Sequence, residues 1–136
     1  MDKVIIDTSA WIKSFRPQCD ETFCHLIKDL IIKECVLLPG IIKAELLRGA
    51  KSRKEYDRLS DLLKGLAYLP VPEEFWGRLS KFSFRLFRSG IIVPLTDTYI
   101  ALLCIENNAP ILHCDKHFNL IARKSPLKIF SDEKWG

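Results

Sequence analysis

The chain has 136 residues, of which 48% are hydrophobic and 28% are charged, and its formal net charge is +4 at pH 7. This length suits one domain with a single core, so we expect residues 1–136 to form one unit. No apolar run reaches the ~18–20 residues that a membrane-spanning helix needs, and no basic and apolar leader precedes the first strand. These features predict a soluble, cytoplasmic protein without membrane contact. A charge of +4 does not by itself identify a nucleic-acid partner.

Short apolar runs alternate with patterns of helical periodicity along the chain. In chain order, we predict a strand at 4–7, helices at 10–15 and 20–34, a strand at 36–38, helices at 39–49 and 51–65, a strand at 67–69, a helix at 72–90, an extended loop at 91–93, a helix at 96–107, a strand at 111–114, a short helix at 118–121 and a strand at 127–130. Thr8 or Ser9 can cap the first helix, Pro39 can open the third, and Thr96 can cap the helix that contains Asp97. This alternation predicts an α/β domain, a three-layer α/β/α sandwich with about five strands.

Aromatic side chains cover more than one face of the predicted helix at 72–90, among them Trp76, Phe84 and Phe87. Two interpretations fit this width. The helix can pack on the sheet with one side and on another chain with the other, or it can be buried all round.

Five cysteines are scattered through the chain without a regular framework: Cys19, Cys24, Cys35, Cys104 and Cys114. Their odd number and their places in mostly apolar runs predict reduced core thiols in a cytosolic protein. His113, Cys114 and His117 have no second ligand pair at zinc-finger spacing, so they do not predict structural zinc.

Two apolar strands end in a carboxylate, the first in Asp7 and the late one in Asp115. Apolar strands of this kind fit a parallel sheet that is buried on both faces and carries its functional groups at the carboxyl edge. If the two strands are neighbours, Asp7 and Asp115 meet there. Glu45 and Asp97 lie on helical patterns that can converge on the same place. Four carboxylates so close together must bind a cation or repel one another.

Glu45 shares a helix face with Ile41 and Ile42, so its side chain is expected to point toward the interior. No Lys or Arg lies on that face within one turn, which predicts a metal or a distant cation as its partner. For Asp7 and Asp97 a structural role explains the sequence equally well, since an acid at a helix start satisfies amide groups and favours the helix dipole.

Basic residues outnumber acidic ones between residues 43 and 88. Lys and Arg clusters beside an acidic metal site suit a phosphate backbone, whereas the alternative is that they cover solvated helix faces. The candidates for phosphate contacts are Arg48, Lys51, Arg53, Arg85 and Arg88.

Four motifs in order resemble the PIN domain family and, within it, VapC-type ribonuclease toxins of type II toxin–antitoxin systems. They are Ile6-Asp7-Thr8-Ser9, Glu45 in an apolar helix, the segment 96–101 (TDTYIA), and the segment 112–118 (LHCDKHF) followed by Ile121-Ala122. The resemblance covers essentially the whole chain. It implies a central parallel sheet with an acidic pocket at its carboxyl edge.

The resemblance also implies a metal-dependent endoribonuclease that uses Mg²⁺ or Mn²⁺, with catalytic and metal-binding roles for Asp7, Glu45, Asp97 and Asp115. We expect Asp7 and Asp97 to be the main metal ligands, Glu45 to help position metal or water, and Asp115 to complete or tune the site. Hydroxyl groups near them can orient the carboxylates or bind phosphate, with these residues as candidates: Thr8, Ser9 and Thr96.

The implied partners are RNA, with transfer or ribosomal RNA as candidate targets, a cognate VapB-like antitoxin in a hydrophobic groove, and a second copy of the chain. One departure is clear, because Lys116 and His117 stand where many VapC-like sequences have a second acid. That leaves the number of metal ions open. His117 is then a phosphate contact or an exposed residue at a helix start.

Two other functions compete with a nuclease. A non-catalytic PIN-like module that binds RNA or protein would be expected to have lost at least one of the four acids. A phospho-acceptor signalling domain of flavodoxin-like fold needs an acidic pair after the first strand, but Asp7 stands alone there. It also needs an acceptor Asp after a middle strand, where this chain has Pro39.

Overall fold

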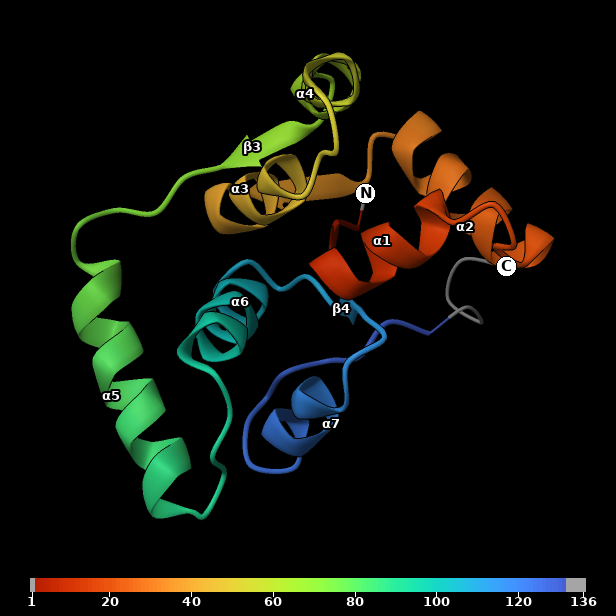
Figure 1. The fold of residues 1–136 in the computed structure, drawn as a ribbon. Helices are drawn as coiled ribbons and strands as arrows, with labels where there is room; N and C mark the ends of the chain where they lie inside the picture. Colours follow the sequence, from red (N-terminus) through yellow and green to blue (C-terminus); the bar gives the residue numbers. More distant parts are fainter. Residues whose placement is uncertain (1, 132–136) are drawn as a thin grey trace.

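Four short parallel strands form the centre of the fold in the computed structural model, which describes residues 2–131 (Figure 1). The strands are β1 (Val4–Ile6), β2 (Val36–Pro39), β3 (Ala67–Leu69) and β4 (Ile111–Leu112). They are hydrogen-bonded in the order β3-β2-β1-β4, with Ile5 of β1 paired to Leu37 on one side and Ile111 on the other. The functional edge of such a sheet is the one where all four strands end.

The predicted fifth strand at 127–130 is reduced to a single parallel bridge between Ile111 and Ile129. The Ile111 N–H donates to the Lys128 carbonyl at 3.0 Å, and the Phe130 N–H donates to the Ile111 carbonyl at 2.9 Å. β4 has only two residues, because the chain turns away after Leu112. Its edge is therefore too short to pair with a full fifth strand. The sheet therefore has four strands in place of the expected five or so.

Seven helices cover the two faces of this sheet within the described residues. They are α1 (Thr8–Phe15), α2 (Glu21–Ile32), α3 (Gly40–Arg48), α4 (Arg53–Lys64), α5 (Phe75–Arg88), α6 (Leu95–Glu106) and α7 (Lys116–Ala122). The chain moves one way from β1 to β3 and returns past β1 to β4, so right-handed connections place α1–α4 and α5–α7 on opposite faces. Contacts follow this division, with α1 and α3 packed together and α6 packed on α5 and α7 (Figure 1). The predicted three-layer sandwich is confirmed.

Helix starts differ from the predictions at three places. Asp7, and not Thr8 or Ser9, caps α1, because its carbonyl accepts the amides of Ala10 and Trp11. The carbonyl of Pro94 accepts the Asp97 N–H at 3.0 Å, so α6 begins before Thr96. Pro39 ends β2 and precedes α3.

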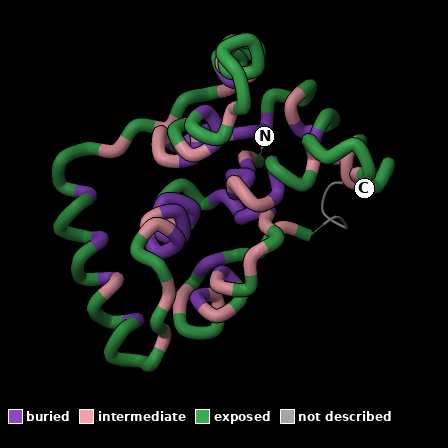
Figure 2. The backbone as a smooth tube through the Cα atoms, in the orientation of Figure 1, coloured by how far each residue is buried: buried purple, intermediate pink, exposed green. Residues whose placement is uncertain are grey.

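The core lies on both sides of β1, whose three residues are at most 1% exposed (Figure 2). This burial agrees with the continuous apolar run that predicted a two-sided parallel strand. Among the large side chains, Trp11, Phe75 and Phe118 are fully buried. α6 is buried along most of its length, which fixes the helix that carries Asp97.

α5 has one buried face and one exposed apolar face. Phe75, Leu79, Phe82 and Leu86 are buried, whereas Trp76, Phe84 and Phe87 are 53%, 61% and 63% exposed. The interpretation in which this helix is buried all round is therefore wrong. No described helix, α5 included, is long and apolar enough to cross a bilayer.

The cysteines correct one expectation. Cys19 and Cys24 form a disulfide, because the loop before α2 folds back onto that helix's first turn. Cys35 and Cys104 are buried in the core as predicted, and Cys114 is exposed in the loop after β4. The scattered spacing did not show the pair, since its members lie five positions apart, one in a loop and one in a helix start.

Candidate active site

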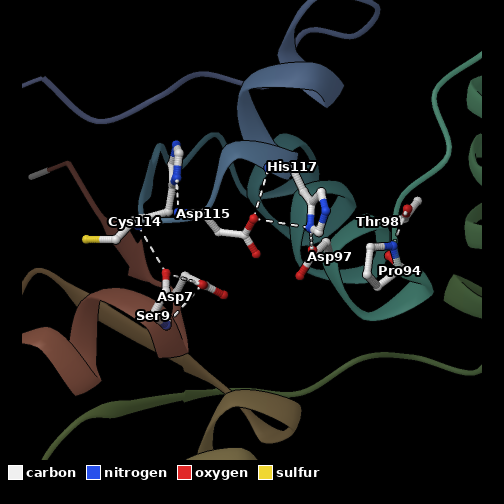
Figure 3. Close-up of polar contacts among 9 residues, drawn as sticks. Asp7, Ser9, Pro94, Asp97, Thr98, Cys114, Asp115 and His117 are labelled. Carbon is white, nitrogen blue, oxygen red and sulfur yellow. Dashed lines mark hydrogen bonds and ion pairs between the residues drawn. The ribbon is translucent and has the colours of Figure 1, made fainter.

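Asp7 and Asp115 meet at the carboxyl edge of the sheet, as the sequence predicted (Figure 3). The Asp7 N–H donates to the Leu112 carbonyl at 2.9 Å, which holds the end of β1 against the end of β4. Asp7 is only 5% exposed. The first acid is thus fixed by the backbone pairing that forms the sheet.

Ser9 connects the two strand ends through its hydroxyl group. Its Oγ donates to Asp7 Oδ2 at 2.6 Å and accepts the Cys114 N–H at 3.0 Å. The Ser9 N–H also donates to Asp7 Oδ2, at 3.1 Å, which is the cap of α1. Asp7 therefore caps a helix and lines the acidic site at once, so its two sequence interpretations are compatible.

Asp97, Asp115 and His117 form a close group (Figure 3). Nδ1 of His117 lies 2.9 Å from Asp97 Oδ2 and 3.1 Å from Asp115 Oδ1. One possible ligand atom from each residue lies within 4.8 Å of the other two. Among the described residues, this is the group of His, Cys, Asp or Glu side chains that can hold a metal ion at such short range.

His117 lies at the start of α7, as predicted, but its side chain is not free in solvent. Its backbone N–H donates to Asp115 Oδ1 at 2.9 Å, and its side chain is 30% exposed. The ring turns back toward the acids. The expectation of an exposed helix-start residue is therefore wrong.

The Asp97 carboxyl lies in an unfavourable place for a negative charge. Burial, and to a smaller extent the charges of Asp115 and Asp7, raise its pKa from 3.8 to about 6 against the opposing effect of the hydrogen bond with His117. The residue is 9% exposed. A cation beside Asp97 would remove this cost, because an opposite charge favours the ionised form.

Glu45 lies beside the start of α1 and is half-buried. Its Oε1 accepts the Thr8 hydroxyl at 2.8 Å. The predicted metal or distant cation is therefore not required as its partner, since the packing of α1 on α3 supplies a neutral donor. Within the part of the chain that the structure describes, Glu45 and Asp7 are not members of the close group. They lie beside it, where Thr8 hydrogen-bonds Glu45 and Ser9 hydrogen-bonds Asp7.

Two further polar residues behave differently from the sequence expectation. Thr96 lies inside the first turn of α6, and none of the described residues hydrogen-bonds its hydroxyl. His113, to which we assigned no role in the site, accepts the Asp115 N–H on Nδ1 at 3.0 Å and packs on Phe118. Burial lowers the pKa of His113, which favours the neutral ring that can accept this bond. Its only sequence signal is its place two residues before a helix cap.

The five candidate phosphate contacts lie in two separate places. Two adjoining grooves between α3 and α4, of about 690 and 510 Å³, share Leu47, Arg48 and Tyr56, and the smaller one is also lined by Lys51 and Arg53. The larger groove also contains Gly40, at the carboxyl end of β2, together with Lys43, Ala44 and Tyr68. A separate pocket of about 630 Å³ contains Arg85, Arg88 and Lys124.

The fold, the parallel-sheet edge and the clustered acids define the class of protein. The PIN domain family matches residues 4–124, and the chain belongs to this family. The resemblance seen in the sequence is confirmed.

Relatives within the family are named ribonucleases. Ribonuclease VapC11 of Mycobacterium tuberculosis is 30% identical over 132 residues, which cover 94% of this chain and 98% of that protein. Ribonuclease VapC18 of the same organism is 27% identical over 121 residues, which cover 86% of this chain and 85% of that protein.

Two solved structures have the same fold. FitAcB from Neisseria gonorrhoeae superposes with a TM-score of 0.76 at 21% identity, covering 94% of this chain and 96% of that one. VapBC2 from Rickettsia felis, bound to a DNA fragment from its promoter, has a TM-score of 0.75 at 18% identity, covering 93% and 96%.

Asp97→Asn should stabilise the metal-free protein above pH 6. A carboxyl whose pKa is raised by folding holds its proton more tightly in the folded state, so wild-type stability falls as the pH rises from about 4 to about 6. Asparagine removes that cost, and we expect a gain on the order of 1–3 kcal/mol at pH 8 that vanishes near pH 4.

Urea unfolding in the presence of a chelator at both pH values measures this difference. Asp61→Asn, an exposed carboxylate on α4, is the matched control and should change stability little at either pH. Equal stability of Asp97→Asn and wild type at pH 8 would contradict a buried charge at this position.

Proposed function

We propose that residues 1–136 act as one cytoplasmic endoribonuclease domain that depends on a divalent metal ion and is the toxin of a VapBC-type pair. The observation that carries this proposal is the convergence of Asp7, Asp97 and Asp115 at the end of the parallel sheet, with Glu45 beside them. Membership of the PIN family and the likeness to proteins named VapC ribonuclease support it.

The donor set fits Mg²⁺ or Mn²⁺, because carboxylate oxygens are the ligands that these ions take in proteins. Asp97 and Asp115 would hold the ion, with Asp7 beside them. When bound, the ion supplies positive charge to the phosphodiester and lowers the pKa of a water molecule.

The remaining polar residues have positioning roles in this proposal. Ser9 holds the Asp7 carboxylate in one orientation and connects it to the loop that carries Asp115. Thr8 fixes Glu45, whose free oxygen can accept a hydrogen bond from water near the site. Thr96 lies in the first turn of α6, one residue before Asp97, and its hydroxyl would bind substrate phosphate.

The larger groove between α3 and α4 is the path we propose for single-stranded RNA. It starts at Gly40, the first residue of α3, at the edge of the sheet where the acids lie. Lys43 and Arg48 can neutralise phosphates, while Tyr56 and Tyr68 offer rings on which bases stack. Arg85 and Arg88 would form a second, separate phosphate patch. Transfer and ribosomal RNA both offer single-stranded loops of the kind such a groove admits.

A second copy of the chain and a VapB-like antitoxin are the protein partners we propose. The exposed aromatic face of α5 supports the dimer, because an uncovered row of Trp76, Phe84 and Phe87 is unusual for a monomer. The antitoxin is supported by the likeness in fold to VapBC and FitAB assemblies.

Cleavage of total RNA by the purified, antitoxin-free protein tests the proposed activity. With Mg²⁺ or Mn²⁺ we expect discrete new RNA ends, mapped by sequencing, and a loss of at least about a hundredfold in rate for Asp7→Asn. A chelator should abolish cleavage. The control variant Asp61→Asn changes an exposed residue of α4 outside the acidic site, and it should cleave RNA at the wild-type rate. Metal binding by the wild type without any cleavage would favour the non-catalytic RNA- or protein-binding module instead.

Arg48→Ala should weaken RNA binding and flatten its salt dependence. Each lost phosphate contact with a single strand lowers the slope of log K against log salt by about 0.7. Filter binding of single-stranded RNA in chelator, across a salt series, measures the slope. Arg16→Ala, an exposed arginine at the end of α1, should leave the slope unchanged, and Arg85→Ala tests the second patch. An unchanged slope for Arg48→Ala would remove this groove from the RNA path.

The double substitution Phe84→Asp and Phe87→Asp should convert a dimer into a monomer. Each copy would bring two negative charges into the interface, where burial and mutual repulsion disfavour them. Analytical ultracentrifugation measures the mass. Phe15→Asp, at an exposed aromatic of α1, is the control and should remain dimeric. A double variant that is still dimeric would place the interface elsewhere.

A further inference from the structure

His117 lies at the point where the two carboxylates of the close group meet. Its Nδ1 is 2.9 Å from Asp97 Oδ2 and 3.1 Å from Asp115 Oδ1. Neighbouring ligands of one octahedral ion lie about 3 Å apart, so Nδ1 has the separation from each acid that a further ligand of a shared cation would have. The three side chains together offer two oxygens and one nitrogen to one ion.

The direction of the ring decides which use is open to Nδ1. A nitrogen that binds the substrate phosphate must point away from the carboxylates, toward an approaching anion. Nδ1 faces the carboxylates instead (Figure 3). The start of α7 holds the residue in this place, since the His117 N–H donates to Asp115 Oδ1. A ligand role therefore fits Nδ1 better than a phosphate contact.

Hydrogen bonds and packing around this group hold its three side chains in one arrangement. His113 accepts the Asp115 N–H, and Ser9 accepts the Cys114 N–H, so two consecutive amides of the loop before α7 are fixed. Asp97 is held on a helix that is buried along most of its length. Hydrogen bonds that orient metal ligands in this way commonly raise the affinity of a site.

We propose that Nδ1 of His117 is a metal ligand and that it makes this site prefer Mn²⁺ to Mg²⁺. The inference rests on the proposed function, whose metal ion it identifies. Mg²⁺ binds oxygen and accepts nitrogen poorly, whereas imidazole suits first-row transition ions. A nitrogen ligand beside two carboxylates therefore shifts the selectivity of the site away from Mg²⁺.

His117→Asp is the sharpest test substitution. A carboxylate Oδ and an imidazole Nδ1 are both two bonds beyond Cβ, so the variant changes the ligand atom without changing its reach. It gives an all-oxygen site, with an added negative charge that favours cations in general. His25→Gln, an exposed histidine on α2, is the matched control, because it removes a ring nitrogen far from the acids. Urea unfolding confirms that each variant is folded.

Pulsed electron paramagnetic resonance of bound Mn²⁺ detects a directly coordinated nitrogen without any substrate. We expect the coupling of one ¹⁴N nucleus in the wild type and in His25→Gln, and its loss in His117→Asp. Bound Mn²⁺ without nitrogen coupling in the wild type would overturn the ligand role of His117.

Competition titration of Mn²⁺ against Mg²⁺ measures the selectivity. The ratio of the two affinities should fall at least about tenfold in His117→Asp and stay unchanged in His25→Gln. An unchanged ratio in His117→Asp would overturn the preference.

These outcomes separate the inference from the proposed function. If the wild type cleaves RNA and binds Mn²⁺ without nitrogen coupling, only the role of His117 fails. If nitrogen coupling is present but no RNA is cut, the ligand role stands and the nuclease fails. If the wild type binds neither ion, both fail.

Discussion

Repulsion among carboxylates at the end of a buried parallel sheet is the constraint on which the site depends. Pairing β1 with β4 brings Asp7 and Asp115 together, and α6 adds Asp97 at the same edge. Desolvation and these neighbours raise the pKa of Asp97 to about 6. Ser9 satisfies Asp7, Thr8 satisfies Glu45, and His117 lies between the other two acids. Each acid thus has a partner that makes the metal-free fold possible.

Because of this repulsion, the site lowers the stability of the fold and the core has to supply it. β1 and α6 are buried, so the acids they carry cannot move apart to relieve repulsion. Stability is lost at this edge and recovered in the apolar layers on either side, as is common where function requires like charges to be close. A bound cation reverses the sign of the effect, because it turns mutual repulsion into shared attraction. The geometry is therefore prepared for an ion before one arrives.

The sequence predicted the parts of the structure that follow from local rules. Apolar runs that end in Asp7 and Asp115 place those acids at one sheet edge, because parallel strands all end on the same side. The three-layer arrangement follows from the alternation of strands and helices. For Glu45 the sequence predicts a charged partner instead of Thr8. The contact with Thr8 depends on the angle at which α1 packs on α3, and hydrophobic periodicity does not predict how two helices pack. The sequence predicts Thr96 as the cap of α6, because the capping carbonyl of Pro94 gives no sequence signal. The ring of His117 was missed for a similar reason, as its direction depends on the neighbouring α6.

A crystal structure of the protein soaked in Mn²⁺, recorded at a wavelength where manganese scatters anomalously, tests most directly whether the clustered acids bind a metal ion. We expect an anomalous peak at coordination distance from Asp97 and Asp115, with Asp7 beside it, and no such peak in Asp97→Asn. A peak that lies elsewhere, or a wild-type crystal in which these acids keep their metal-free contacts in excess Mn²⁺, would contradict it.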